Sequence, residues 1–167
     1  MSVKDFVQQR SDDFIAMRRD FHMYPEPAWL EYRSAAKVAE KLIALGYDVA
    51  LGADVLDLDS RMGLPSEEAM KAAMARAMDE GADPELVEKM GYGKTAIVAT
   101  MKFSDDGPVV AFRADMDSND VIESKASNHI PAKNGFRSRH DKAMHACGHD
   151  THMTMGLGLA AVSYTHL

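Results

Sequence analysis

The segment AMHACGHDTHM, residues 143–153, brings together the single cysteine of the chain and three of its seven histidines. One cysteine cannot form an intramolecular disulfide, so Cys147 is a metal ligand, a nucleophile paired with a histidine, or a buried thiol. If the segment is extended, side-chain alternation places His145, Cys147 and His149 on one face, and Gly148 lets a metal approach closely. Thiolate and imidazole ligands favour zinc, while nearby carboxylates widen the choice to manganese.

A second pair of candidate residues, Asp115 and Asp117, ends the apolar stretch PVVAFRADMD. Carboxylates at positions i and i+2 of a strand lie on one face, and ligands of open α/β sheets bind beyond the carboxyl ends of the strands. We therefore expect the two aspartates to accept hydrogen bonds from a ligating histidine and to fix its tautomer. The alternative is that both aspartates merely end the strand in solvent.

The elements that must position these residues begin with helices. Apolar residues at three- and four-residue intervals predict a helix from Val3 to Phe21, which the following prolines end. A second helix is predicted from Ser34 to Leu45, with Gly46 as its C-cap. The sequence YDVAL then predicts a short strand.

The region 66–90 is predicted to be helical, with a break near Gly81. Methionines spaced four residues apart form one stripe, which either packs against the body of the protein or serves as an adaptable binding surface, and we favour packing. These are Met70, Met74 and Met78. We expect this region to be a helical insertion outside the sheet, so that its deletion leaves the core folded.

The strands that lead to the aspartates are predicted at 94–103 and 108–115, joined by a DDG turn. Residues 118–143 are polar and irregular, and GLGLAAV near the C-terminus favours another helix. Helices alternating with apolar strands are typical of an α/β fold.

The composition limits the classes of protein that fit. A chain of 167 residues with 46% hydrophobic and 27% charged residues is sufficient for one soluble domain with a sizeable core. Its net charge of −7 argues against a nucleic-acid partner and against an anionic membrane surface. The N-terminus lacks the pattern of a signal peptide, and the apolar runs are too short to cross a bilayer, so we expect a cytoplasmic protein.

These motifs resemble a known family. FRADMD followed by MHACGHDTH, with RRDFHMYPEPAWLEYRSA near the N-terminus, resembles the signature of the metal-dependent amidohydrolases of the aminoacylase and carboxypeptidase type. Within that family, ALGYDVALG and SRMGLP are most similar to the aminobenzoyl-glutamate hydrolase branch, in its A-type form. The resemblance implies that residues 1–162 form the N-terminal part of a zinc-peptidase-like α/β catalytic domain. That domain has a mixed sheet flanked by helices and is incomplete in this chain.

By position, the resemblance makes Cys147 and His149 ligands of a two-metal site that holds zinc or manganese. Asp115 and Asp117 become its catalytic acids, and Asp150 a hydrogen-bond acceptor beside it. Two ions can polarise an amide carbonyl and activate a bridging water. The implied reaction is hydrolysis of an N-acyl amino acid such as aminobenzoyl-glutamate, by a dimer or by a hetero-oligomer with a B-type subunit.

The other polar residues near these motifs carry weaker signals. His22 lies in the N-terminal motif, but its helical position favours a packing role. His145 and His152 flank the expected ligands and are candidates to support them. Asn119 departs from the apolar residue that usually follows ADMD in the family. No role is assigned to His129, His140 and His166.

The family takes its general base and its remaining metal ligands from downstream segments that have no counterpart here. We therefore expect residues 1–167 to be inactive alone. The tail 163–167 is atypical of the family and is a candidate sequencing artefact. Two alternatives stay open: a cysteine hydrolase with Cys147 as its nucleophile, and a non-catalytic module that binds metal or a second protein chain.

Overall fold

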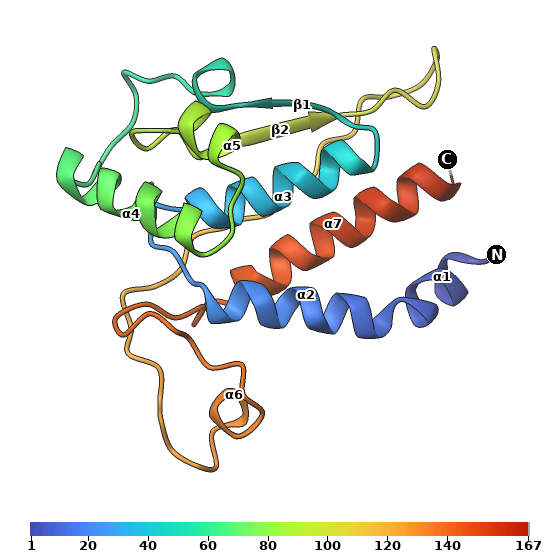
Figure 1. Cartoon of the computed structure of the whole chain (residues 1–167). Helices are drawn as coiled ribbons and strands as arrows, with labels where there is room; N and C mark the ends of the chain where they lie inside the picture. The colour runs from blue at the N-terminus through green and yellow to red at the C-terminus, as the bar shows by residue number, and fades with distance from the viewer. Residues whose placement is uncertain (167) are drawn as a thin grey trace.

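The computed structural model describes residues 1–166 and arranges them in layers around one central helix, α3 (Figure 1). A two-stranded sheet packs on one side of α3, and α7 and α2 lie on the other. Helices α4 and α5 pack beside α3. The helices are α1 (Val3–Gln9), α2 (Ser11–Met23), α3 (Tyr32–Ala44), η1 (Gly52–Val55), α4 (Glu67–Asp79), α5 (Pro84–Lys89), α6 (Ile130–Lys133) and α7 (His149–His166). The strands are β1 (Asp48–Leu51) and β2 (Ile97–Thr100).

The N-terminal region forms two helices where the sequence predicts one. The backbone of Arg10, at φ −105° and ψ 12°, departs from helical geometry and separates α1 from α2. The first helix begins with a capping box, because Ser2 accepts from the Asp5 amide and the Asp5 side chain accepts from the Ser2 amide. At the other end of the chain, His166 Nε2 lies 3.1 Å from the Met1 carbonyl oxygen, so the two ends lie side by side (Figure 1).

Helix α3 starts at Tyr32, slightly before the predicted Ser34, because a buried carboxylate completes its first turn. The two oxygens of Glu26 accept the backbone amides of Arg33 at 2.9 Å and Ser34 at 2.7 Å. These amides have no partner within the helix, so Glu26 takes the part of an N-capping side chain. Burial raises the pKa of Glu26 to about 7. The predicted C-terminal signal is confirmed, since Gly46 follows the helix with φ +83°.

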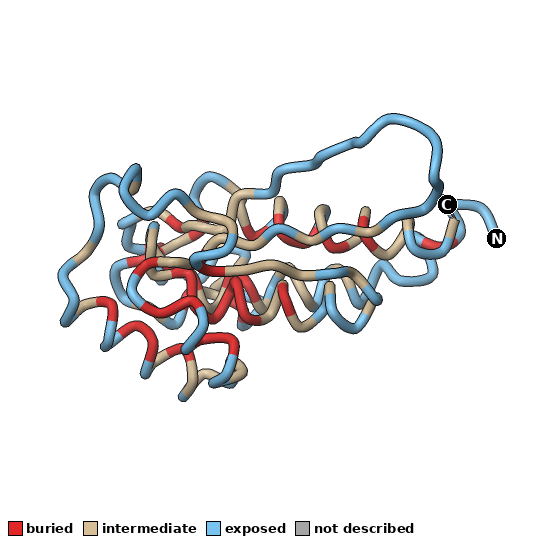
Figure 2. Tube along the Cα trace, turned by 90° about the horizontal axis from the view of Figure 1, so that it is seen from above, coloured by how far each residue is buried: buried red, intermediate tan, exposed pale blue. Residues whose placement is uncertain are grey.

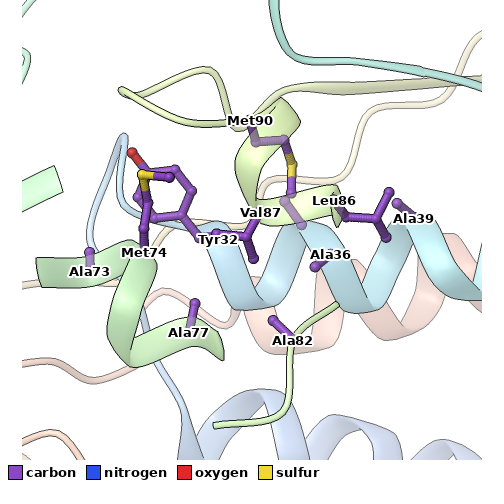
Figure 3. Packing of buried hydrophobic residues seen from close by; sticks show 11 residues of the cluster. Tyr32, Ala36, Ala39, Ala73, Met74, Ala77, Ala82, Leu86, Val87 and Met90 are labelled. Atoms are coloured by element: carbon purple, nitrogen blue, oxygen red, sulfur yellow. The ribbon is translucent and has the colours of Figure 1, made fainter. Parts of the chain in front are cut away.

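The main core lies where α3 meets α4 and α5. Figure 3 shows side chains of α4 and α5 facing α3, with Met74 and Val87 close to Tyr32. Met70 and Met74 are each only 7% exposed, and Met78 packs against the same cluster. The packing interpretation of the methionine stripe is therefore confirmed. Since α4 and α5 supply much of this cluster, the expectation that the core folds without 66–90 conflicts with the packing.

A second, smaller cluster joins α2 to α7. Phe21 of α2 packs with Met153 and Leu157 of α7, and all three are at most 4% exposed. This contact fixes α7 against α2 and so determines where the N-terminal turn of α7 lies.

The sheet within residues 1–166 consists of β1 and β2, which pair antiparallel with Asp48 opposite Thr100 and Leu51 opposite Ile97. The predicted strand at 108–115 is wrong: this segment has no strand structure and belongs to the long exposed stretch seen in Figure 2. Val109 is 99% exposed and Phe112 73%. A strand requires a hydrogen-bonded neighbour, and no part of the described chain pairs with this one.

No helix between residues 1 and 166 has both the length and the hydropathy that crossing a bilayer requires.

Candidate metal centre

The candidate site forms where residues 115–117 pass the first turn of α7. Gly148, at φ +82°, turns the chain into that helix, a conformation that glycine adopts without strain. His149 and His152 follow three residues apart, so both imidazoles project from the same face of the helix. Their rings stack with centroids 5.0 Å apart and planes 27° apart.

Three side chains converge at this turn. Ligand atoms of Asp115, His149 and His152 all lie within 4.8 Å of one another, and each residue is partly buried. Two imidazole nitrogens and a carboxylate oxygen suit zinc, and the carboxylate also suits manganese. The group therefore has the donor chemistry and the spacing to hold a divalent cation with an open side for further ligands.

The aspartates approach the two histidines in different ways. Asp117 holds His149, whose Nδ1 lies 3.0 Å from the Asp117 carboxylate and 2.8 Å from its carbonyl oxygen. A donor hydrogen bond from Nδ1 leaves Nε2 of His149 available for a metal. The Asp115 carboxylate lies 3.7 Å from Nδ1 of His152, and the guanidinium of Arg113 holds the pKa of Asp115 below its usual range.

Cys147 does not belong to this three-residue group within the described chain. The predicted shared face of His145, Cys147 and His149 is wrong, because the segment turns: His145 is 4% exposed, whereas the Cys147 side of the turn is open to solvent. The backbone amide of Cys147 donates to the Asn119 side chain at 3.1 Å, which fixes this turn beside the aspartate segment. The positive φ of Gly148 then rotates His149 away from the strand-like alternation.

Other predicted residues lie in the layer beneath the site. His22 and Asp150 are joined by a bond of 2.8 Å between Nδ1 and Oδ2, and both are buried. His145 is buried nearby, and neither of its ring nitrogens has a hydrogen-bond partner among residues 1–166. Burial lowers the pKa of His145 to about 4, so its ring is neutral at pH 7.

Two residues of this site carry little or no signal in the sequence. His152 is predicted only as a supporting group, because the predicted C-terminal helix begins after it. Once α7 is known to begin at His149, the three-residue spacing of the two histidines is a clear signal. Glu123 is not among the predicted residues at all. It lies in an irregular segment, and its partner His22 is 101 residues away, so no local pattern could have indicated it.

Comparison with known proteins supports this description of the fold and the motifs. No protein-family model matches the chain. The chain is 44% identical over 160 residues to indole-3-acetyl-aspartic acid hydrolase of Enterobacter agglomerans, covering 96% of this chain and 37% of the relative. It is 45% identical to the A-type component of p-aminobenzoyl-glutamate hydrolase of Escherichia coli, covering 95% of this chain and 36% of that protein.

A solved structure matches as well. The aminobenzoyl-glutamate utilization protein of Klebsiella pneumoniae superposes with a TM-score of 0.80 at 36% identity, over 99% of this chain and 35% of that one. The chain thus has the sequence and the partial α/β fold of hydrolases of the aminoacylase and carboxypeptidase type, as its motifs predict. Among these, it matches the A-type component of aminobenzoyl-glutamate hydrolase over most of its length. It spans little more than a third of the length of these relatives.

Proposed function

We propose that this protein takes part in the metal-dependent hydrolysis of the amide bond of an N-acyl amino acid. The observation that carries the proposal is the convergence of Asp115, His149 and His152 within 4.8 Å in a chain similar to named amidohydrolases. The two relatives described above are named for amides of aspartic acid and glutamate. We therefore propose an N-acylated acidic amino acid, such as aminobenzoyl-glutamate, as the substrate.

In this proposal, His149, His152 and Asp115 hold a divalent cation, zinc or manganese. When bound, such an ion polarises the amide carbonyl and lowers the pKa of a bound water. Asp117 keeps the His149 ring oriented by accepting from Nδ1, which raises the basicity of the ligating nitrogen. Cys147, two residues before His149 and exposed, is proposed as a ligand of a second ion.

We propose that residues 1–167 do not form a complete catalytic centre. Three donors leave the coordination of two ions unfinished, and hydrolysis needs a base within hydrogen-bond reach of the attacking water. The relatives are much longer, and one is named as one of several different subunits, so further groups are proposed to come from other parts of the protein or from a second chain. A cytoplasmic location is proposed from the single cysteine and the absence of a predicted signal peptide.

The test combines metal binding with turnover. Cobalt(II) titration followed by absorbance should show binding by the unaltered chain and its loss in His149→Ala and His152→Ala. A Cys147→Ser variant should bind fewer ions per chain. If Cys147→Ser instead kept its metal stoichiometry but abolished hydrolysis of aminobenzoyl-glutamate, the protein would be a cysteine hydrolase. If the unaltered chain bound no divalent cation, the proposed function would be wrong.

A further inference from the structure

A buried ion-pair cluster lies directly beneath the candidate metal centre. Its centre is His22, whose side chain is 3% exposed and whose two ring nitrogens each contact a carboxylate. Nδ1 lies 2.8 Å from Oδ2 of Asp150, and Nε2 lies 3.0 Å from Oε1 of Glu123. The side chains of both acids are 0% exposed. Such a cluster needs a reason, because burying three ionisable groups opposes folding unless every one is paired.

The geometry determines the protonation of His22. An ionised carboxylate can only accept a hydrogen bond, so both ring nitrogens of His22 must donate, and the ring is an imidazolium. Burial by itself would lower the pKa of His22, but its bonds with Asp150 and Glu123 outweigh burial and raise it above the ordinary value. The pKa of each acid is correspondingly lowered: burial opposes this, but the bonds to His22 prevail.

Each carboxylate is also fixed from a second side. Asp150 accepts from Nε of Arg18 at 2.8 Å, and this arginine lies on the same helix as His22. Glu123 accepts the backbone amide of Ser138 at 2.5 Å and contacts His129 Nε2 at 2.8 Å. The cluster therefore joins α2, the irregular segment 118–145 and α7 at one point.

That point is the first turn of α7. Asp150 is the second residue of this helix and directly follows His149, so the bond to His22 fixes the rotation of the turn. Successive residues of a helix are about 100° apart around its axis, so a small rotation of α7 would move both imidazoles away from Asp115. Such a rotation would also leave the buried Asp150 charge without a partner, which is strongly unfavourable.

We propose that His22 is a positioning residue of the candidate metal centre: through Asp150, it holds the first turn of α7 in the rotation that aims His149 and His152 at Asp115. This inference rests on the proposed function, because it requires that the group binds a cation. His22 itself does not touch the group. A role in packing alone would require neither the charge nor the direct contact with the residue next to His149.

His140 provides a matched control. It also contacts a carboxylate, Glu80 at 2.8 Å, and a backbone carbonyl, that of Pro25 at 2.6 Å. Like His22, it joins distant parts of the chain, but neither of its partners lies on α7. A variant of His140 therefore tests what is lost when a bridging histidine is removed without disturbing the metal-binding turn.

The experiment compares the full chain with His22→Gln, Asp150→Asn and His140→Gln. Each is titrated with cobalt(II) while the ligand-field absorbance is recorded, and circular dichroism confirms folding at that temperature. We expect His22→Gln and Asp150→Asn to weaken cobalt binding by about 10- to 100-fold and to change the absorbance spectrum of the bound ion. His140→Gln should keep both the affinity and the spectrum.

The outcomes separate this inference from the proposed function. If the unaltered chain and His149→Ala bind cobalt equally, the metal centre itself is wrong. If His149→Ala loses binding while folded His22→Gln keeps the affinity and spectrum of the unaltered chain, only the positioning role is overturned. If His22→Gln does not fold, Asp150→Asn decides, because the amide keeps the shape of the carboxylate and removes its charge.

Discussion

Helix α4 and the segment 108–112 both carry closely spaced apolar side chains, yet α4 is buried against α3 while the segment is exposed. Met74 of α4 is 7% exposed, whereas Val109 is 99% exposed. The two differ in whether the described chain offers a complementary surface. A helix satisfies its own backbone and needs only an apolar face to pack on, but a strand also needs a neighbour for its hydrogen bonds. Apolar residues in sequence therefore indicate burial only when such a partner exists.

The strongest test of this comparison is deletion of residues 66–90. Because α4 and α5 supply much of the main cluster around α3, we expect the deletion to abolish cooperative folding. Loss of the thermal unfolding transition and of native far-ultraviolet circular dichroism would show this. A deletion variant that unfolds cooperatively, with the helix content of the remaining segments, would contradict the result and restore the expectation of a dispensable insertion.

A smaller change in the same cluster should still be costly. Met90 is fully buried, so Met90→Ala should lower the free energy of unfolding by about 2–5 kcal/mol through lost burial and a residual cavity. Urea denaturation measures this, and Val109→Ala provides the exposed counterpart. We expect the latter to change stability by no more than about 0.5 kcal/mol. Equal losses in the two variants would mean that 108–112 is buried in solution.

Electrostatics beneath α3 provides a further difference. Since burial raises the pKa of Glu26 from 4.5 to about 7, the folded protein binds more protons than the unfolded chain between these values. The contribution of Glu26 to stability is thus present below pH 4.5 and is lost as the pH rises to 7. The loss is on the order of 3 kcal/mol at most.

The measurement is the pH dependence of the unfolding free energy in the unaltered chain, in Glu26→Gln and in the exposed control Glu85→Gln. Glu26→Gln should remove most of the decline between pH 4.5 and 7 that Glu85→Gln retains. Parallel curves for all three proteins would show that Glu26 stays ionised throughout this range.

The smallest effect on stability is expected in the exposed segment itself. Val110, which is 65% exposed, can be replaced by lysine with little change in the free energy of unfolding. Exposed apolar side chains favour association, so Val110→Lys should reduce concentration-dependent self-association in sedimentation velocity. Unchanged association with a lower midpoint of unfolding would show that this side chain contributes to folding instead.

The helices of this fold are largely predictable because their signals are local. Periodic apolar residues indicate α3, α4 and α5, and Gly46 marks a helix end. The break at Arg10 is not predictable, since the apolar period continues through it. The strand at 108–115 could not be judged either, because a strand depends on a neighbour that the segment itself does not specify.

The site is predictable in its chemistry but not in its geometry. The motifs correctly indicate the residues around Asp115 and His149, which the structure brings together. The face shared by Cys147 and His149 is wrong, because one glycine in a left-handed conformation changes the direction of the chain. The bond between His22 and Glu123 spans 101 residues, and only the tertiary fold brings these residues into contact.

The proximity of Met1 and His166 has a topological consequence. A chain whose ends meet is nearly a ring with a single cut, and the position of that cut can be moved by protein engineering. The exposed DDG turn after β2 offers a new opening, because its backbone lies in solvent and carries no ladder hydrogen bonds. A circular permutant opened there, with a short glycine-rich linker between the old ends, would keep α2 and α7 as neighbours while reversing their order along the chain.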